Sequence, residues 1–213
     1  MPPQIIDYSL YFVTSQEYSS KKSSLDIANL AASGGIDIIQ MREKNMPNDE
    51  LISLGKNIST LCKKSNILFI VNDDPEIAAN LNADGVHLGQ EDLIKFPIAK
   101  TRKIIGQNRI IGVSTHSLEE FKQANELDIN YLAFGPIFTT KTKNYSIGTS
   151  QIKEVLKIAR FPVIFIGGIN TVNMEELLKL GAKNIALIRE ITESNNIADK
   201  VRELKNIILK YKG

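Results

Sequence analysis

Short apolar runs alternate with longer amphipathic segments along the whole chain, with a period of about twenty-five residues. That period matches one strand and one helix joined by short loops. Eight runs are predicted to be strands: Leu10–Val13, Ile36–Met41, Leu68–Asn72, Gly85–Leu88, Ile110–Ser114, Tyr131–Phe134, Val163–Ile166 and Ile185–Ile188. Most of them lack polar alternation, so we expect strands buried on both faces, as in a parallel sheet.

Capping residues indicate where the helices between these strands begin and end. Ser24 is predicted to cap a helix that ends before Gly34, and a last helix is predicted over Asn195–Tyr211. Three further boundaries carry recognised signals: Pro47 in a first turn, Ser117 with Glu120, and Asn173 with Glu176. Nearly every predicted strand is therefore followed by a helix.

This α/β pattern allows two architectures, a closed (β/α)₈ TIM barrel and an open doubly wound sheet. The count of eight units favours the closed barrel. An open nucleotide-binding sheet would show a glycine-rich turn after its first strand, whereas this chain has Thr14, Ser15 and Gln16 there. No linker divides residues 1–213, so we expect one barrel domain.

Composition and charge narrow the class of protein. The 213 residues are 43% apolar and 23% charged, as in ordinary globular proteins, and the formal charge of +2 is too small for a non-specific nucleic-acid binder. No apolar run is long enough to span a membrane, and Asp7 interrupts any signal-like segment. The only cysteine, Cys62, is predicted to pack in a helix core, and a cytoplasmic protein is expected, for which a homodimer is allowed.

Polar side chains follow the second, third and fourth predicted strands. Strand alternation places Gln40, Arg42 and Lys44 on one side, although an isolated Arg-Glu-Lys is more often a solvated loop. Asp73 and Asp92 follow neighbouring strands, and such hard oxygen ligands suit Mg²⁺ that takes its remaining ligands from water and phosphate. A turn residue and a helix cap are the structural alternatives for these two aspartates.

The later strands end in residues suited to an anion. Ser114 closes the fifth, a long polar loop over 135–149 follows the sixth, and Gly167-Gly168 follows the seventh. In barrels of this kind the loops after strands seven and eight commonly hold a phosphate, although a lone Gly-Gly is more often a turn. His116 is expected to be a loop or helix-entry residue, with acid–base catalysis as the alternative, and His87 a packed residue.

Taken together, several strings resemble thiamine-phosphate synthase. They are Gln40-Met41-Arg42-Glu43-Lys44, Val71-Asn72-Asp73, Gly85-Val86-His87-Leu88-Gly89-Gln90-Glu91-Asp92, Phe134-Gly135-Pro136-Ile137-Phe138 with the following threonines and lysine, and Ile166-Gly167-Gly168-Ile169. They occur in order over roughly residues 8–205. The resemblance implies a (β/α)₈ barrel that joins hydroxymethylpyrimidine pyrophosphate to thiazole phosphate, releasing pyrophosphate and forming thiamine phosphate.

The resemblance also implies roles for single residues. The whole segment Gln40–Lys44, with Met41 and Glu43, falls in the substrate site. Gln40 would meet the pyrimidine, and the pyrophosphate would be held by Arg42, Lys44, Asn72, Ser114 and Lys143, of which Arg42, Lys44 and Lys143 are the catalytic cations. Asp73 and Asp92 would bind Mg²⁺. The thiazole phosphate would be held by Thr140, Lys141, Thr142, Gly168, Ile188 and Arg189.

The chain departs from the family pattern at two places. Thr139 stands where the family usually has proline, and Lys141 lies between the two threonines. Arg189 replaces the usual serine; it is expected to bind the thiazole phosphate, or alternatively to pair with Glu190 or Glu193.

Two other functions stay open at this stage. A thiazole tautomerase is a related barrel, and the segment around His116 resembles its histidine-bearing segment, but it has no need of pyrophosphate cations together with two metal aspartates. A non-catalytic phosphate-binding barrel is the other, against which the intact Asp73, Asp92, Arg42 and Lys143 argue. The synthase reaction itself asks for Mg²⁺ and preplaced cations at the leaving pyrophosphate, and for no protein nucleophile.

Overall fold

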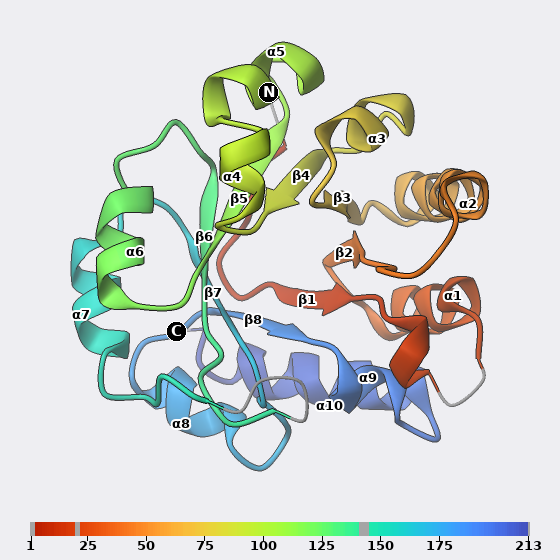
Figure 1. Ribbon diagram of the computed structural model, residues 1–213. Coiled ribbons are helices and arrows are strands. Elements are labelled where there is room, and N and C mark those ends of the chain that lie inside the picture. Colours follow the sequence, from red (N-terminus) through yellow and green to blue (C-terminus); the bar gives the residue numbers. More distant parts are fainter. Residues whose placement is uncertain (1–2, 20–21, 141–144, 213) are drawn as a thin grey trace.

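The computed structural model describes residues 3–19, 22–140 and 145–212. Eight parallel strands pair in sequence order, and the last pairs with the first, so the sheet closes into a barrel (Figure 1). The strands are β1 (Leu10–Val13), β2 (Ile38–Met41), β3 (Leu68–Asn72), β4 (Gly85–Leu88), β5 (Ile110–Thr115), β6 (Tyr131–Phe134), β7 (Val163–Ile166) and β8 (Asn184–Leu187). The predicted TIM barrel is confirmed.

Helices surround this barrel in Figure 1. They are the 3₁₀ turn η1 (Gln16–Tyr18), α1 (Ser24–Gly34), α2 (Asn48–Ser65), α3 (Pro75–Asn80), α4 (Asp92–Lys95), α5 (Ile98–Ile105), α6 (Leu118–Ala124), α7 (Ile152–Ile158), α8 (Met174–Lys179), α9 (Arg189–Thr192) and α10 (Ile197–Leu209). None of the helices in the described ranges is long and apolar enough to cross a membrane.

Two predicted strand starts are wrong by one or two residues, each for a local reason, and the fifth and eighth strands end one residue from the predicted position, at Thr115 and Leu187. The second strand begins at Ile38, because the backbone N–H of Ile36 donates to Ala31 O at 3.3 Å and so belongs to the end of α1. The eighth begins one residue early, at Asn184, whose side-chain oxygen accepts a hydrogen bond from the Ser9 N–H at 3.0 Å.

Two predicted caps also need correction. Ser23, not Ser24, caps α1, since its hydroxyl accepts from Asp26 N at 3.1 Å. Asn173 precedes α8 but makes no capping bond to it; its side-chain amide donates to Gly168 O at 2.9 Å and so steadies the loop after β7. The Ser117 cap of α6 is confirmed, with Glu120 N donating to its hydroxyl at 3.1 Å.

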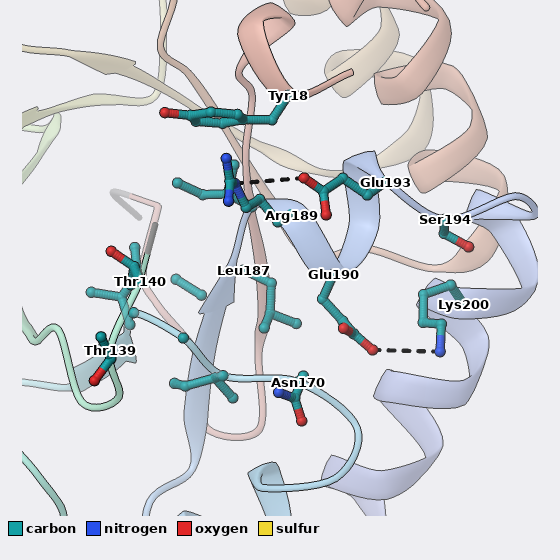
Figure 2. Close-up of a pocket in the computed structure, with 16 residues that line it drawn as sticks. Tyr18, Thr139, Thr140, Asn170, Leu187, Arg189, Glu190, Glu193, Ser194 and Lys200 are labelled. Carbon is teal, nitrogen blue, oxygen red and sulfur yellow. Dashed lines mark ion pairs between the residues drawn. The ribbon is translucent and has the colours of Figure 1, made fainter. Parts of the chain in front are cut away.

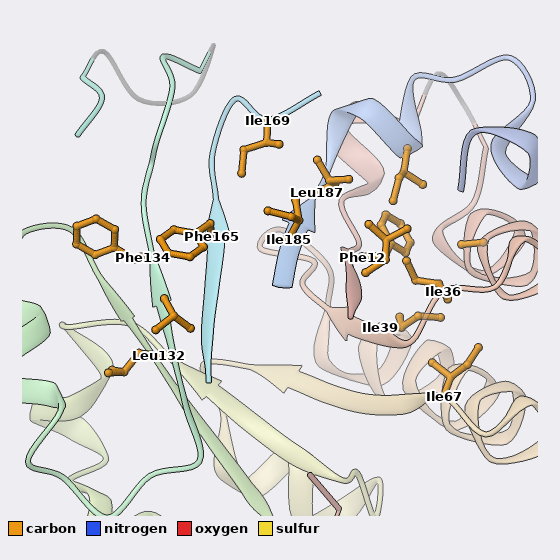
Figure 3. Close-up of a cluster of buried hydrophobic side chains, with 14 of the residues drawn as sticks. Phe12, Ile36, Ile39, Ile67, Leu132, Phe134, Phe165, Ile169, Ile185 and Leu187 are labelled. Carbon is orange, nitrogen blue, oxygen red and sulfur yellow. The ribbon is translucent and has the colours of Figure 1, made fainter. Parts of the chain in front are cut away.

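The main apolar core lies between the barrel and its helices (Figure 3). Strand alternation sends Phe12 outward into this layer and Tyr11 inward into a smaller cluster inside the barrel. Cys62 is buried in the outer layer, as predicted.

The first and last helices pack against each other across the point of closure. A β-carbon at Gly34 of α1 would stand 2.7 Å from the β-carbon of Val201 on α10, so only glycine permits this approach. The α10 stripe is buried as predicted: Ile197, Val201, Leu204 and Ile208.

Candidate active site

The segment that ends β2 divides its side chains between two faces, as alternation predicts. Gln40 points into the barrel, where its amide nitrogen donates to the Tyr11 hydroxyl at 2.7 Å. Met41 is only 1% exposed and packs in the outer core, which leaves its backbone alone available to a ligand. One face of this segment therefore lines the barrel interior below its mouth, and the other packs in the hydrophobic core.

Glu43 has a supporting task that the sequence did not indicate. Its carboxylate accepts hydrogen bonds from the hydroxyls of Thr14 and Ser24, at 2.6 and 2.5 Å, and from Gln16 N at 2.9 Å. Because these donors all come from the segment after β1, Glu43 fixes that segment against β2. Its predicted contact with substrate stays a prediction.

Asp73 follows β3 and Asp92 follows β4, and the two carboxyls lie close enough for Asp92 to raise the pKa of Asp73. Asp73 holds a backbone φ of +66°, unusual for a residue with a side chain, while its N–H donates to His87 O at 2.8 Å. Asp92 begins α4, and its Oδ2 accepts from Gly89 N at 2.8 Å. Such a strained backbone persists only where its surroundings enforce it.

The electrostatics of this pair favours a bound cation. Burial, the hydrogen bond with Asp92 and the charge of Asp92 raise the pKa of Asp73 to about 6, while Lys44 and Arg42 act to lower it. Two carboxylates this close resist ionising together, and a hard cation between them relieves that repulsion. The described part of the chain contains no group of three or more His, Cys, Asp and Glu suited to a metal. A pair of oxygen donors fits Mg²⁺ that keeps waters and takes phosphate oxygens.

Polar side chains also line the barrel interior below the mouth. Tyr11, Gln40, His87, Ser114 and Tyr131 form a continuous line of hydrogen bonds from β2 to β5. His87 was predicted only as a packed residue; it is buried, but both ring nitrogens are hydrogen bonded, to Tyr131 and to Ser114. The available signal was a tyrosine at an inward position on two of the strands.

A cavity of about 420 Å³ opens between the ends of β7 and β8 (Figure 2). Gly167 and Gly168 line it with φ of +99° and +67°, and a β-carbon at Gly168 would stand 2.7 Å from Thr139 O. Glycine is therefore required for the loop after β6 to lie this close to the loop after β7. Thr140 and Ile188, both predicted for the thiazole phosphate, also line the cavity.

Arg189 lies at the edge of this cavity and contacts two side chains, Tyr18 and Glu193. Figure 2 shows its guanidinium against the ring of Tyr18, with 4.0 Å between Cζ and the ring centroid, and beside Glu193 at 3.6 Å. Its buried Nε has no hydrogen-bond partner in the described structure. Glu190, the other predicted partner, pairs instead with Lys200 at 3.5 Å. The predicted pairing with Glu193 is found, and Arg189 still lines the cavity.

The remaining predicted residues fall into three groups. Asn72 and Ser114 are half-buried near the ends of their strands. Lys141, Thr142 and Lys143 lie outside the described residues, so their predicted roles stay predictions. His116 is a helix-entry residue as expected: its N–H donates to Glu120 Oε2 at 2.7 Å, and its Nδ1 lies 2.6 Å from Gly135 O.

A closed parallel barrel with charged side chains gathered at the carboxyl ends of its strands is the arrangement of (β/α)₈-barrel enzymes. A family model described as thiamine monophosphate synthase matches residues 10–191. This chain belongs to that family.

Individual relatives agree over nearly the full length. A thiamine-phosphate synthase of Persephonella marina is 40% identical over 205 residues, covering 95% of this chain and 97% of that protein. One of Lawsonia intracellularis is 38% identical over 212 residues, covering 98% of this chain and 96% of the other. The solved thiamine phosphate pyrophosphorylase of Pyrococcus furiosus has a TM-score of 0.88 at 34% identity, covering 97% of this chain and 98% of that one.

Proposed function

We propose that this protein is a thiamine-phosphate synthase, a transferase that joins hydroxymethylpyrimidine pyrophosphate to thiazole phosphate and releases pyrophosphate. The observation that carries the proposal is the contact between Asp73 and Asp92 within the field of Arg42 and Lys44. Two carboxylates and two cations at one place suit a metal-bound diphosphate leaving group. Membership of the family supplies the identity of the two substrates.

The residues of the mouth have distinct tasks in this reaction. As the carbon–oxygen bond to pyrophosphate breaks, negative charge develops on the leaving group, and the preplaced cations Arg42 and Lys44 stabilise it. Asp73 and Asp92 would hold Mg²⁺, which neutralises further charge on the diphosphate. Asn72 and Ser114 add neutral hydrogen bonds, and Lys143 is the third predicted cation.

The second substrate is assigned to the cavity between β7 and β8. The thiazole nitrogen is the nucleophile, so the protein has to hold the ring and its phosphate in place rather than attack. Gly168 and Ile188 offer backbone groups at the cavity wall, and Arg189 offers a cation at its edge. Binding both substrates side by side at the barrel mouth would turn a bimolecular reaction into a reaction within one complex.

The tautomerase alternative is less well supported by the same geometry. It would need an acid–base residue, and the contact of His116 Nδ1 with the Gly135 carbonyl leaves that role to the other ring nitrogen. It would also leave the Asp73–Asp92 pair without a task. The cytoplasm and a homodimer belong to the proposal as well.

The deciding experiment is an assay of the purified protein with both substrates and Mg²⁺, with thiamine phosphate detected as product. Formation of thiamine phosphate that requires both substrates supports the proposal. Reactions lacking one substrate, and the Asp73→Asn variant, are the controls. Interconversion of thiazole isomers without coupling would identify a tautomerase, and absence of any turnover would identify a non-catalytic barrel.

A further inference from the structure

A line of five hydrogen-bonded side chains crosses the barrel interior beneath the mouth; we call it the relay. Gln40 Nε2 donates to the Tyr11 hydroxyl at 2.7 Å, and the hydroxyls of Tyr11 and Tyr131 are 2.9 Å apart. His87 Nδ1 lies 2.8 Å from the Tyr131 hydroxyl, and His87 Nε2 lies 2.8 Å from Ser114 Oγ. The two ends, Gln40 and Ser114, are both predicted substrate contacts.

The orientation of the Gln40 amide, together with burial of the hydroxyls, sets the direction of each bond in the relay. Tyr11 and Tyr131 are at most 1% exposed, so a hydroxyl proton without an acceptor would be costly. Because Tyr11 accepts from Gln40, its own proton goes to Tyr131, and the Tyr131 proton then goes to His87 Nδ1. This leaves His87 protonated at Nε2, from which it donates to Ser114 Oγ.

His87 takes part as a neutral ring. Complete burial, with a smaller contribution from the charge of His116, lowers the pKa of His87 to about 4. Burial likewise raises the pKa of both tyrosines above the usual value. A relay runs in a single direction only if each of these three groups is neutral and carries one proton to donate.

The two ends of the relay are left with defined and opposite capacities. Ser114 Oγ accepts from His87, and no further bond of its hydroxyl is found among the described residues, so its proton is available to an anion. Gln40 Oε1 has no donor among those residues either, so it is available to accept. Turning the Gln40 amide over would reverse every bond and consume the Ser114 proton.

We propose that the relay couples the two ends of the pyrimidine site and makes Tyr131 and His87 positioning residues. A ring with an N–H donor at Gln40 and an anionic oxygen at Ser114 matches the direction found. A ring with an acceptor at Gln40 would reverse the relay and deprive the diphosphate of the Ser114 proton. Assigning these ligand groups rests on the proposed function; the direction of the relay does not.

The direction can be measured in the free protein by ¹⁵N NMR of the histidine rings. The chain has only two histidines, so His116→Gln leaves one ring to assign. We expect His87 to be neutral and protonated at Nε2 at pH 7, and to lose this single tautomer in Tyr131→Phe. A ring protonated at Nδ1 would overturn the proposal.

Coupling can be measured by kinetics in a double-mutant cycle. Ser114→Ala should raise the KM for the pyrimidine substrate about ten- to a hundredfold, the loss expected for a hydrogen bond to a charged group. Tyr131→Phe should raise the same KM about fivefold in the wild-type background and leave it unchanged when Ser114 is already alanine. Tyr211→Phe removes a hydroxyl outside the relay and the cavity, and should change neither.

The possible outcomes distinguish a failure of the relay proposal from a failure of the proposed function. Equal effects of Tyr131→Phe in both backgrounds would mean that Tyr131 acts only through the fold, and would overturn the coupling. A wild-type protein without synthase turnover, but with His87 protonated at Nε2, would overturn the proposed function while leaving the direction of the relay intact.

Discussion

Gly112 on β5 lies directly against the ring of Tyr131 on β6: a β-carbon at position 112 would stand 2.0 Å from Tyr131 Cζ and 2.4 Å from its hydroxyl oxygen. No side chain fits there while the tyrosine keeps its place. The glycine thus makes the room that the relay needs in the centre of the barrel.

Gly112→Ala should therefore displace Tyr131 and destabilise the fold. Overpacking of a filled interior typically costs a few kcal/mol, and we expect about 3 kcal/mol, measured by denaturant unfolding. The same change made together with Tyr131→Ala should cost less, because the ring that it meets is gone. An equal cost in both backgrounds would show that the ring is not the obstacle.

Asp73→Asn and Asp92→Asn should each reduce synthase turnover strongly at limiting Mg²⁺ and leave the fold intact. Mg²⁺ with pyrophosphate should raise the thermal midpoint of the wild-type protein but not of these variants, since ligands stabilise only the state that binds them. Asp7→Asn is the matched control, because Asp7 pairs with Lys183 in an exposed ion pair. Near-normal turnover of both variants would contradict the metal assignment.

Arg189→Ser should raise the KM for thiazole phosphate about tenfold or more and leave that for the pyrimidine substrate nearly unchanged. The reason is loss of a charge-assisted contact worth about 1.5–3 kcal/mol. Glu193→Gln removes the ion pair but keeps the guanidinium against Tyr18, and should not weaken this substrate. If Arg189→Ser leaves the KM for thiazole phosphate unaltered, the only role of Arg189 is structural, through its contacts with Tyr18 and Glu193.

Acidification should destabilise the protein through His87. The pKa of His87 is about 4 when folded and about 6.5 in an unfolded chain, so between these values the unfolded chain binds a proton that the folded chain does not. This contribution is fully present above pH 6.5 and is lost as the pH falls toward 4, by at most about 3 kcal/mol. His87→Gln cannot titrate and should show a shallower fall in unfolding free energy over this range. Parallel curves would contradict the low pKa.

The barrel could be predicted from the sequence because its strands are continuous apolar runs with helices between them. The errors are local: Ser23 and Ser24 are both able to cap α1, and Ile36 is as apolar as a strand residue although it closes the helix end. Which serine caps the helix, and where the helix ends, depends on side-chain geometry within a single turn.

The site was predictable where it follows strand ends, and less so where it depends on distant partners. Arg189 and Glu193 are four residues apart on one helix, a spacing that is visible in the sequence, and their pairing was among the predicted alternatives. The stacking of Arg189 on Tyr18 was not, because only closure of β8 against β1 brings η1 to that side of the mouth. The relay was missed for the same reason, since His87 and Tyr131 meet across two strand boundaries.

The contact between Gly34 and Val201 also bears on how the chain is made. The apolar face of α1 leaves the ribosome early, but the helix that covers it is about 160 residues further on, which at 5–20 residues per second is a delay of roughly 10 to 30 seconds. Throughout that interval β1 lacks its β8 neighbour and α1 lacks α10. Nascent chains of this protein should therefore bind chaperones through their first forty residues, and release them only after the C-terminus has emerged.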